Sequence, residues 1–269
     1  MPGILGEVSK RGVLKNFGEN KKKNLIVDKI ESKNYYVERR TINKFLNDKV
    51  FWDEKYIVIT EGVILNSLKL IEKYRASDFK SAIIKMYETN GEKFFGEFRG
   101  SFSGLFYDKQ KDIWLIYTNH IGDKQIFYSK TENGIIFGSE INYLVEYMRN
   151  NNIKYTFDKI GAYFLLTYGY MLEDYTLFKE IKKLNAGKYI KIKNDNFEIH
   201  TYFEVDNTPD NTLTEEEIIE NVDKLFRNAV KLEFEKDKEY GYKHVASLSG
   251  GLDSRMTTWV AHELGYLEQ

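Results

Sequence analysis

The segment Ser249-Gly250-Gly251-Leu252-Asp253-Ser254 constrains the fold of this chain more than any other. The mainly apolar run His244–Leu248 precedes it and predicts a short buried strand. Residues 255–264 follow it and predict a helix, because Met256, Trp259, Val260 and Leu264 recur at helical spacing. A strand, a glycine-rich loop and a helix in this order form a cradle for a phosphate group.

Each residue type in this loop suits the binding of an anion. Glycine lets backbone N–H groups approach a ligand without a Cβ in the way, and a helix N-terminus adds oriented donors with partial positive charge. Ser249 and Ser254 offer hydroxyl donors, and the carboxylate of Asp253 suits Mg²⁺. The loop lacks the lysine of a Walker A loop. An ordinary tight turn after a strand is the alternative interpretation.

The loop resembles the pyrophosphate loop of the ATP pyrophosphatase superfamily, whose members activate a carboxylate or carbonyl group as an adenylate. The resemblance implies that ATP and Mg²⁺ bind here and that Asp253 is the metal ligand. The residues expected to hold the pyrophosphate are Leu248, Ser249, Gly250, Gly251, Leu252, Asp253 and Ser254.

Composition excludes several classes of protein. The 269 residues suit one large or two small domains, and a hydrophobic content of 42% suits a sizeable core. A net charge of -1 argues against nucleic-acid binding, and no apolar stretch is long enough for a transmembrane helix. The four histidines show no metal-ligand spacing. Without cysteine or a signal-peptide pattern, we expect a cytoplasmic protein.

Residues 1 to about 200 predict two packed sheets with helices outside. Expected strands are Tyr56–Thr60, Phe102–Tyr107, Ile113–Tyr117, Gln125–Tyr128 and Gly134–Phe137. Asp78 is expected to cap a helix that ends at Asn90-Gly91, and residues 140–147 predict another helix.

A polar segment, 206–212, predicts a linker, after which Thr214 and Glu217 form a capping box. The helix that follows has an apolar face from Ile218 to Val230, and 233–243 predicts a charged connection. An open parallel sheet needs several strand–helix units to bury its faces, yet only one fits after His244. We therefore expect the chain to stop just inside a second domain. A small helical appendage is the alternative.

The whole chain resembles the N-terminal part of the asparagine synthetase family. That family joins a class II glutamine amidotransferase domain to an ATP pyrophosphatase domain. Ordered segments carry the resemblance: Met1–Gly6, Glu61–Asn66, Ser77-Asp78, Gly100–Ser103, Tyr107-Asp108, Ile121–Tyr128, Phe137–Ile141 and, loosely, Asn185–Tyr189. Their order, together with the loop, makes chance agreement improbable.

Three departures from the family pattern fall in its glutaminase site. Pro2 stands where the family has its nucleophilic cysteine, and no cysteine occurs elsewhere. Glu61 replaces the asparagine that donates to the oxyanion, and Val63 replaces a glutamate. We therefore expect no catalytic residue for glutamine hydrolysis here. General-base action by an exposed N-terminal Pro2 is a remote alternative.

Other positions of that site match the family. The resemblance implies that Arg39 pairs with the carboxylate of an amino-acid ligand, that Asp78 reads its amine, and that Gly62 is kept. A surface charge at Arg39 and a helix cap at Asp78 are equally weighted alternatives.

We expect an α+β fold: a four-layer αββα sandwich of the N-terminal-nucleophile hydrolase type over 1–205, then a linker helix and the first βα unit of an α/β pyrophosphate-loop domain over 213–269. The implied function is part of an ATP-dependent amide-forming ligase that adenylates a carboxylate substrate. Ammonia or an amine would then attack, as in β-lactam synthetases and lasso-peptide cyclases, which lack the cysteine. A non-catalytic scaffold or dimerisation domain is the alternative, and a homodimer stays open. No nucleic acid or membrane is expected as a partner.

Overall fold

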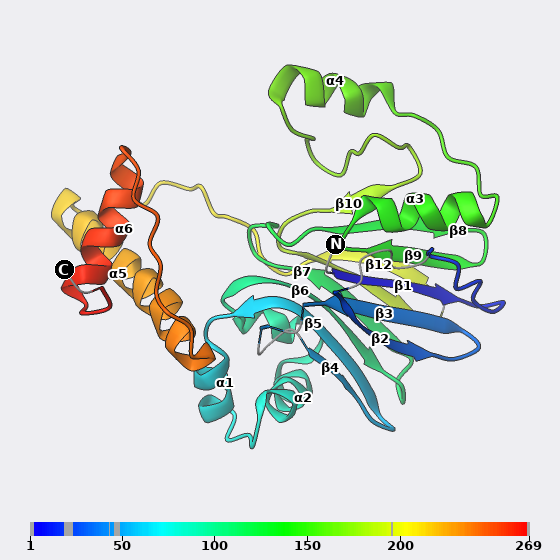
Figure 1. Cartoon of the computed structure of the whole chain (residues 1–269), viewed down its shortest axis with the longest axis horizontal. Coiled ribbons are helices and arrows are strands. Elements are labelled where there is room, and N and C mark those ends of the chain that lie inside the picture. The colour runs from blue at the N-terminus through cyan, green and yellow to red at the C-terminus, as the bar shows by residue number, and fades with distance from the viewer. Residues whose placement is uncertain (1–2, 19–23, 43, 46–48, 195, 268–269) are drawn as a thin grey trace. The chain divides into compact units, whose positions relative to one another are not determined.

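Two compact units, Met1–Glu204 and Val205–Gln269, make up the chain in this computed structural model (Figure 1). The structure describes residues 3–18, 24–42, 44–45, 49–194 and 196–267. None of the helices in those ranges has the length and apolar character that crossing a bilayer requires.

Two six-stranded sheets form the first unit, and their described strand pairings are all antiparallel. The strand orders are β10-β8-β9-β1-β3-β2 and β12-β11-β7-β6-β5-β4. The prediction of two mainly antiparallel sheets is therefore confirmed. The strands are β1 (Gly3–Ser9), β2 (Ile26–Glu31), β3 (Tyr35–Thr41), β4 (Lys49–Trp52), β5 (Tyr56–Ile64), β6 (Gly100–Asp108), β7 (Ile113–Thr118), β8 (Ile126–Thr131), β9 (Gly134–Gly138), β10 (Lys182–Leu184), β11 (Lys188–Lys193) and β12 (Asn196–Thr201).

The central strands are buried on both faces. In β5, Ile57 and Ile59 belong to the core between the sheets, which also contains Ile4 of β1. Val58 belongs to the core on the opposite face, because successive residues of a strand point to opposite sides. Double burial explains why Tyr56–Thr60 has no alternation of polar and apolar residues.

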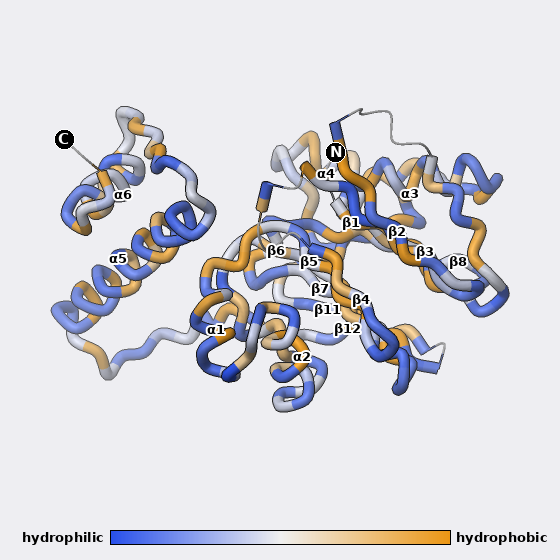
Figure 2. Tube along the Cα trace, turned by 60° about the horizontal axis from the view of Figure 1, so that its bottom comes forward, coloured by the Kyte–Doolittle hydropathy of each residue, from blue (hydrophilic) through white to orange (hydrophobic). Residues whose placement is uncertain are grey.

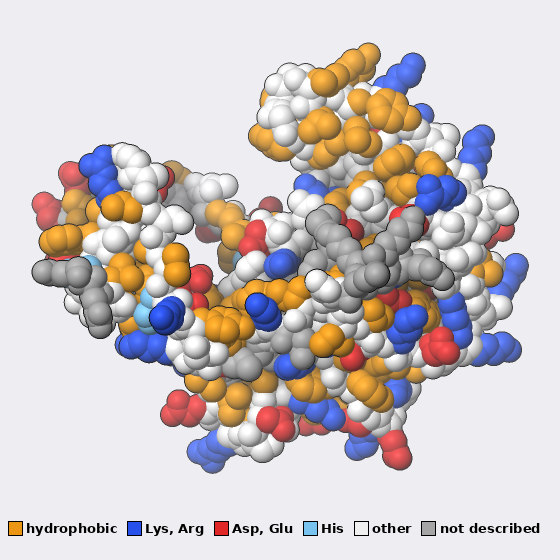
Figure 3. Space-filling view, viewed as in Figure 1, with side chains coloured by type: hydrophobic (Ala, Val, Ile, Leu, Met, Phe, Trp, Pro, Cys, Tyr) orange, Lys and Arg blue, Asp and Glu red, His pale blue; other side chains and the backbone are white. Residues whose placement is uncertain are grey.

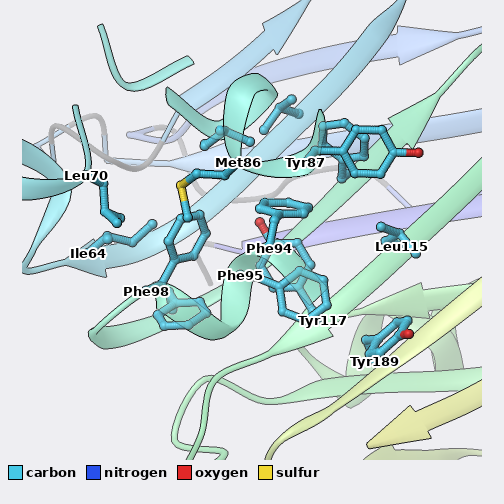
Figure 4. Packing of buried hydrophobic residues seen from close by; sticks show 14 of the residues in the cluster. Ile64, Leu70, Met86, Tyr87, Phe94, Phe95, Phe98, Leu115, Tyr117 and Tyr189 are labelled. Atoms are coloured by element: carbon cyan, nitrogen blue, oxygen red, sulfur yellow. The ribbon is translucent and has the colours of Figure 1, made fainter. Parts of the chain in front are cut away.

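Helices cover the outer face of each sheet. On the second sheet, α1 (Ser67–Lys73), α2 (Phe79–Asn90) and the 3-10 helix η1 (Gly91–Glu97) share a core rich in aromatic residues (Figure 4). There Phe95 stacks on Tyr117 of β7 with ring centroids 4.3 Å apart. On the first sheet, α3 (Ile141–Asn150) shares a core with Leu5 of β1. The layers run helix, sheet, sheet, helix, which confirms the predicted αββα sandwich.

Capping and turn residues in the sequence predicted the ends of several helices and strands to within a few residues. Asp78 caps α2, since its carboxylate accepts a hydrogen bond from the Ser81 N–H at 2.7 Å. Gly91 follows the helix with a φ of 67°. The helix expected over 140–147 occupies 141–150 as α3, and the strand expected over 125–128 occupies 126–131 as β8.

The second unit contains α5 (Glu215–Tyr240) and α6 (Leu252–Glu263), which pack through Val230, Phe234, Val260 and Ala261. Thr214 and Glu217 form the predicted capping box, with hydrogen bonds of 3.2 and 2.9 Å. Hydrophobic residues recur along α5 (Figure 2). Several of them are exposed, and Leu225 is 69% exposed. Trp259 of α6 is 59% exposed.

Two predictions for this unit are wrong. The segment 233–243 is not a connection, because α5 continues to Tyr240. Lysine and glutamate are good helix formers, and Lys231–Glu235 makes an i,i+4 ion pair at 3.6 Å. His244–Leu248 forms no strand, and Val245 and Leu248 are exposed. A strand needs a neighbour for its backbone groups, and the described part of this unit contains no strand.

Candidate functional site

A polar cluster lies where strands of the two sheets end close to one another. Glu61 lies on β5 of the second sheet, and Ser139 directly follows β9 of the first. The Ser139 hydroxyl donates a hydrogen bond to Oε2 of Glu61. The same oxygen accepts a weaker one from the Ser103 hydroxyl at 3.4 Å. Glu61 is only 8% exposed, and these hydroxyls are among the groups that satisfy its buried carboxylate.

Lys124 provides the nearest cation to this carboxylate among the described ion pairs. Its Nζ lies 4.0 Å from Oε1 of Glu61. The loop after β7 carries it: the Thr118 hydroxyl donates to the Lys124 carbonyl at 2.5 Å, and the buried Asn119 donates from Nδ2 to the Gly100 carbonyl at 3.1 Å. The cluster thus combines one buried carboxylate, two hydroxyls and a partly exposed ammonium group.

Gly62, beside Glu61, is a position that only glycine fits. Its φ is 96°, and an added Cβ would lie 2.2 Å from the Ser101 carbonyl oxygen on the paired strand. The retained glycine therefore has a backbone reason that is independent of any ligand.

Tyr143 of α3 closes the cluster on the side of β1. An added Cβ on Gly3 would lie 3.0 Å from Ser139 and 3.6 Å from the Tyr143 ring. Burial raises the pKa of Tyr143 to about 12, so its hydroxyl stays protonated at neutral pH.

Arg39 is buried and forms an ion pair, so the alternative of a surface charge at this position is wrong. It lies on β3 opposite Asp28 of β2, and its Nε donates to Asp28 Oδ2 at 3.1 Å. Asp78, by contrast, is the helix cap described above and is exposed. No described hydrogen bond or ion pair joins Arg39 or Asp78 to Glu61. Their service to an amino-acid ligand stays a prediction.

Sequence reasoning missed Ser139 and Lys124 as members of the cluster. Both lie in segments that carry the family resemblance, Phe137–Ile141 and Ile121–Tyr128. Their place in those segments is the sequence feature that could have indicated them. Pro2, the expected replacement of the nucleophile, lies outside the described residues.

The glycine-rich loop of the second unit forms the N-terminus of α6, with Gly251 as the capping position. The Ser249 and Ser254 hydroxyl oxygens lie 2.8 Å apart, and the Ser249 N–H donates to Ser254 Oγ at 3.0 Å. An added Cβ on Gly250 would meet nothing within 4 Å. Packing within the unit therefore does not require glycine there, whereas approach of an anion to the backbone would.

Comparisons with known proteins point to one class. A model of a glutamine amidotransferase domain matches residues 50–203. A provisionally named asparagine synthetase 2 (glutamine-hydrolysing) of Methanocaldococcus jannaschii is 30% identical over 216 residues, covering 77% of this chain and 40% of that protein. Asparagine synthetase 1 (glutamine-hydrolysing) of Bacillus subtilis is 25% identical over 219 residues, covering 78% and 33%. The chain thus spans well under half the length of these relatives.

Among solved structures, a glutamine aminotransferase class-II domain protein from Silicibacter pomeroyi aligns with 76% of this chain and all of that chain, at 7% identity and a TM-score of 0.43.

The layered fold and the matched model define the first unit as a glutamine amidotransferase-type domain. The chain belongs to the glutamine amidotransferase domain family, and its curated relatives make it asparagine synthetase-like.

Proposed function

We propose that this chain is the N-terminal part of an asparagine synthetase-like, ATP-dependent amide-forming ligase whose amidotransferase domain does not hydrolyse glutamine. One observation supports the proposed absence of glutamine hydrolysis. Glu61, a buried carboxylate, occupies the position where the family resemblance expects an amide that donates to an oxyanion.

The chemistry of amide hydrolysis explains why this matters. Attack on the glutamine amide places negative charge on the carbonyl oxygen, and hydrogen-bond donors must stabilise that charge. An ionised carboxylate only accepts hydrogen bonds. The Glu61 carboxylate already accepts hydrogen bonds from the Ser139 and Ser103 hydroxyls. The chain also has no cysteine to supply a thiolate nucleophile.

The nitrogen donor in such a ligase is free ammonia or an amine of the substrate. A carboxylate attacks the α-phosphate of ATP and releases pyrophosphate, and the nitrogen nucleophile then displaces AMP. Ser249 and Ser254 would hold the pyrophosphate with their hydroxyls, and the backbone at Gly250 and Gly251 leaves space for it.

Asp253 is exposed at the first turn of α6, and Mg²⁺ bound there would neutralise phosphate charge. No cluster of three or more His, Cys, Asp or Glu side chains suited to a metal occurs within the described ranges.

A non-catalytic scaffold is the second candidate function for the first unit. The hydrogen bond between Glu61 and Ser139 favours it, because Glu61 lies on a strand of one sheet and Ser139 directly follows a strand of the other. A former reaction centre would then serve to hold the sheets together. This role is compatible with a place inside the ligase.

Calorimetric titration with Mg·ATP tests the ligase half of the proposal. One loop supplies few hydrogen bonds to ATP. Binding costs the ligand roughly 4–15 kcal/mol in lost translational and rotational freedom, and these hydrogen bonds offset only part of that cost. We expect saturable but weak binding, with a Kd of about 1 mM or worse, and no ATP–pyrophosphate exchange. Gly250→Ala and Asp253→Ala should each weaken binding further. Gly250→Ala should keep the melting temperature, since its methyl group meets nothing.

Two results would contradict this account. Absence of any saturable binding would remove the loop as a phosphate site. Micromolar binding that is lost in Asp253→Ala would show a complete ATP site within this chain.

A further inference from the structure

A cavity of about 640 Å³ opens between the two sheets, at the end of the first unit opposite the polar cluster. Val8, near the end of β1, lines the cavity, whereas Ile4, near the start of β1, donates its N–H to Ser139 of the cluster. Four strand residues span about 13 Å, so the two places are separate. Small-molecule sites measure about 300–1,000 Å³. We call this space the hairpin cavity, because the hairpins β2–β3, β6–β7, β8–β9 and β11–β12 all contribute lining residues.

Aromatic side chains from both sheets line the hairpin cavity. Tyr107 and Trp114 lie opposite each other on β6 and β7, and their rings stack with centroids 3.8 Å apart. Tyr35 of β3, on the other sheet, meets the Trp114 ring edge-on with centroids 5.2 Å apart. Phe197 of β12 adds a fourth ring. Tyr35, Tyr107 and Phe197 are only partly buried. This wall suits a planar ring, because aromatic rings attract one another edge to face or in offset stacks.

The rim of the hairpin cavity carries an excess of positive charge. Three basic and two acidic side chains line it: Lys10, Arg11, Lys130, Asp112 and Glu132. Asp112 already accepts the Tyr107 hydroxyl at 3.0 Å. Among the described residues no carboxylate pairs with Arg11 or Lys130. Lys130 Nζ instead lies 4.2 Å from the centroid of the Phe197 ring. Figure 3 shows Lys and Arg side chains around this end of the first unit, where Figure 1 places the ends of β1 and β8.

The aromatic wall and the basic rim together define a class of ligand. A neutral ring would leave the rim cations without a partner, and a simple inorganic anion would leave the aromatic wall in water. We propose that the hairpin cavity binds a small planar aromatic molecule that carries a negative charge. The ring packs against Tyr35, Tyr107 and Phe197. The anionic group lies at Arg11 and Lys130, whose side chains donate to it.

Two sources of ligand share this chemistry, nucleoside monophosphates and aromatic carboxylates. The inference does not depend on the proposed ligase function, because every residue that supports it belongs to the first unit.

Calorimetric titration of the full chain without Mg²⁺ tests the proposal. AMP represents the nucleotides, and indole-3-acetate represents the aromatic carboxylates. We expect saturable binding of at least one of them, with a Kd of about 0.1 mM or tighter. Adenosine and indole lack the anionic group, and inorganic phosphate lacks the ring. Each of these three should bind at least roughly tenfold more weakly than the ligand that combines both parts.

Lys130→Ala should raise the Kd roughly tenfold, because it removes a cation from the rim. Lys159→Ala is the matched control and should keep the Kd. Lys159 is also an exposed lysine, but it begins α4 (Lys159–Tyr168) and does not line the cavity. Both side chains are exposed, so both variants should keep the circular dichroism spectrum.

A second measurement locates the bound ligand. The chain has three tryptophans, so isotopic labelling of the indole nitrogens gives three side-chain resonances by NMR, which Trp→Phe variants assign. The ligand should shift the resonance of Trp114 and leave those of Trp52 and Trp259, which lie outside the cavity. Absence of saturable binding of both ligands at about 5 mM, far above the expected Kd, overturns the proposal. A shift confined to Trp259, or an equal loss of affinity in Lys159→Ala and Lys130→Ala, also overturns it.

Discussion

The Ser139 hydroxyl and the Glu61 carboxylate form a hydrogen bond that joins the two sheets of the first unit. Ser139 Oγ in turn accepts the Ile4 N–H at 3.0 Å, which extends the link to β1. The link therefore occupies the position of the proposed former reaction centre with groups that satisfy one another. At this position the Glu61 carboxylate can accept structural hydrogen bonds, but its negative charge would repel an oxyanion.

The Glu61–Ser139 pair should contribute measurably to stability. Glu61→Ala leaves the buried Ser103 hydroxyl and the partly buried Ser139 hydroxyl without their acceptor, and we expect a loss of about 2–4 kcal/mol in the free energy of unfolding. Ser139→Ala should cost about 1–3 kcal/mol. Urea denaturation of both variants and of the double variant measures the coupling, expected at about 1–2 kcal/mol. Strict additivity would show that the bond is energetically neutral.

Gly62 should tolerate no side chain. Gly62→Ala combines a left-handed backbone with a contact of 2.2 Å to Ser101, and we expect a destabilisation of about 2–5 kcal/mol. Gly169→Ala is the matched control, since Gly169 also has a positive φ, in the left-handed helical region, but its added Cβ meets nothing within 4 Å. It should cost about 1 kcal/mol. Equal melting temperatures for the two variants would contradict this reading of Gly62.

The Asp78 cap should make stability depend on pH. Hydrogen bonds from the Ser81 backbone N–H and hydroxyl lower the pKa of Asp78. A carboxyl group with a lowered folded-state pKa contributes stability above its unfolded pKa of about 3.9 and loses it as pH falls further. At pH 7, Asp78→Ala should lower the free energy of unfolding by about 1 kcal/mol. The difference in the free energy of unfolding between this variant and the unchanged chain should shrink below about pH 4.

Asp78→Asn is the control for this cap. Asparagine also caps helices but does not titrate in this range, so the variant should keep most of the stability at pH 7. Chemical denaturation at several pH values gives the comparison. A gap between Asp78→Ala and the unchanged chain that is constant from pH 7 to pH 3 would rule out a titrating cap.

Features set by neighbouring residues were predictable from the sequence. The cap at Asp78, the capping box at Thr214 and the strand at Tyr56–Thr60 depend on a few adjacent positions. The partner of Glu61 was not predictable, because Ser139 lies 78 positions away and meets it only when the two sheets stack. The strand expected at His244–Leu248 failed for the same reason, since a strand is stabilised by neighbours that local sequence does not contain.

The most direct test of the account is glutamine hydrolysis by the purified chain in a coupled glutamate assay. We predict no glutamate release above that of a heat-denatured sample. Pro2→Cys alone should stay inactive, because Glu61 still opposes an oxyanion and Val63 still replaces the family glutamate. Glutamate release that holds a constant specific activity through purification, and that disappears in Glu61→Gln, would contradict the proposal that this site no longer hydrolyses glutamine.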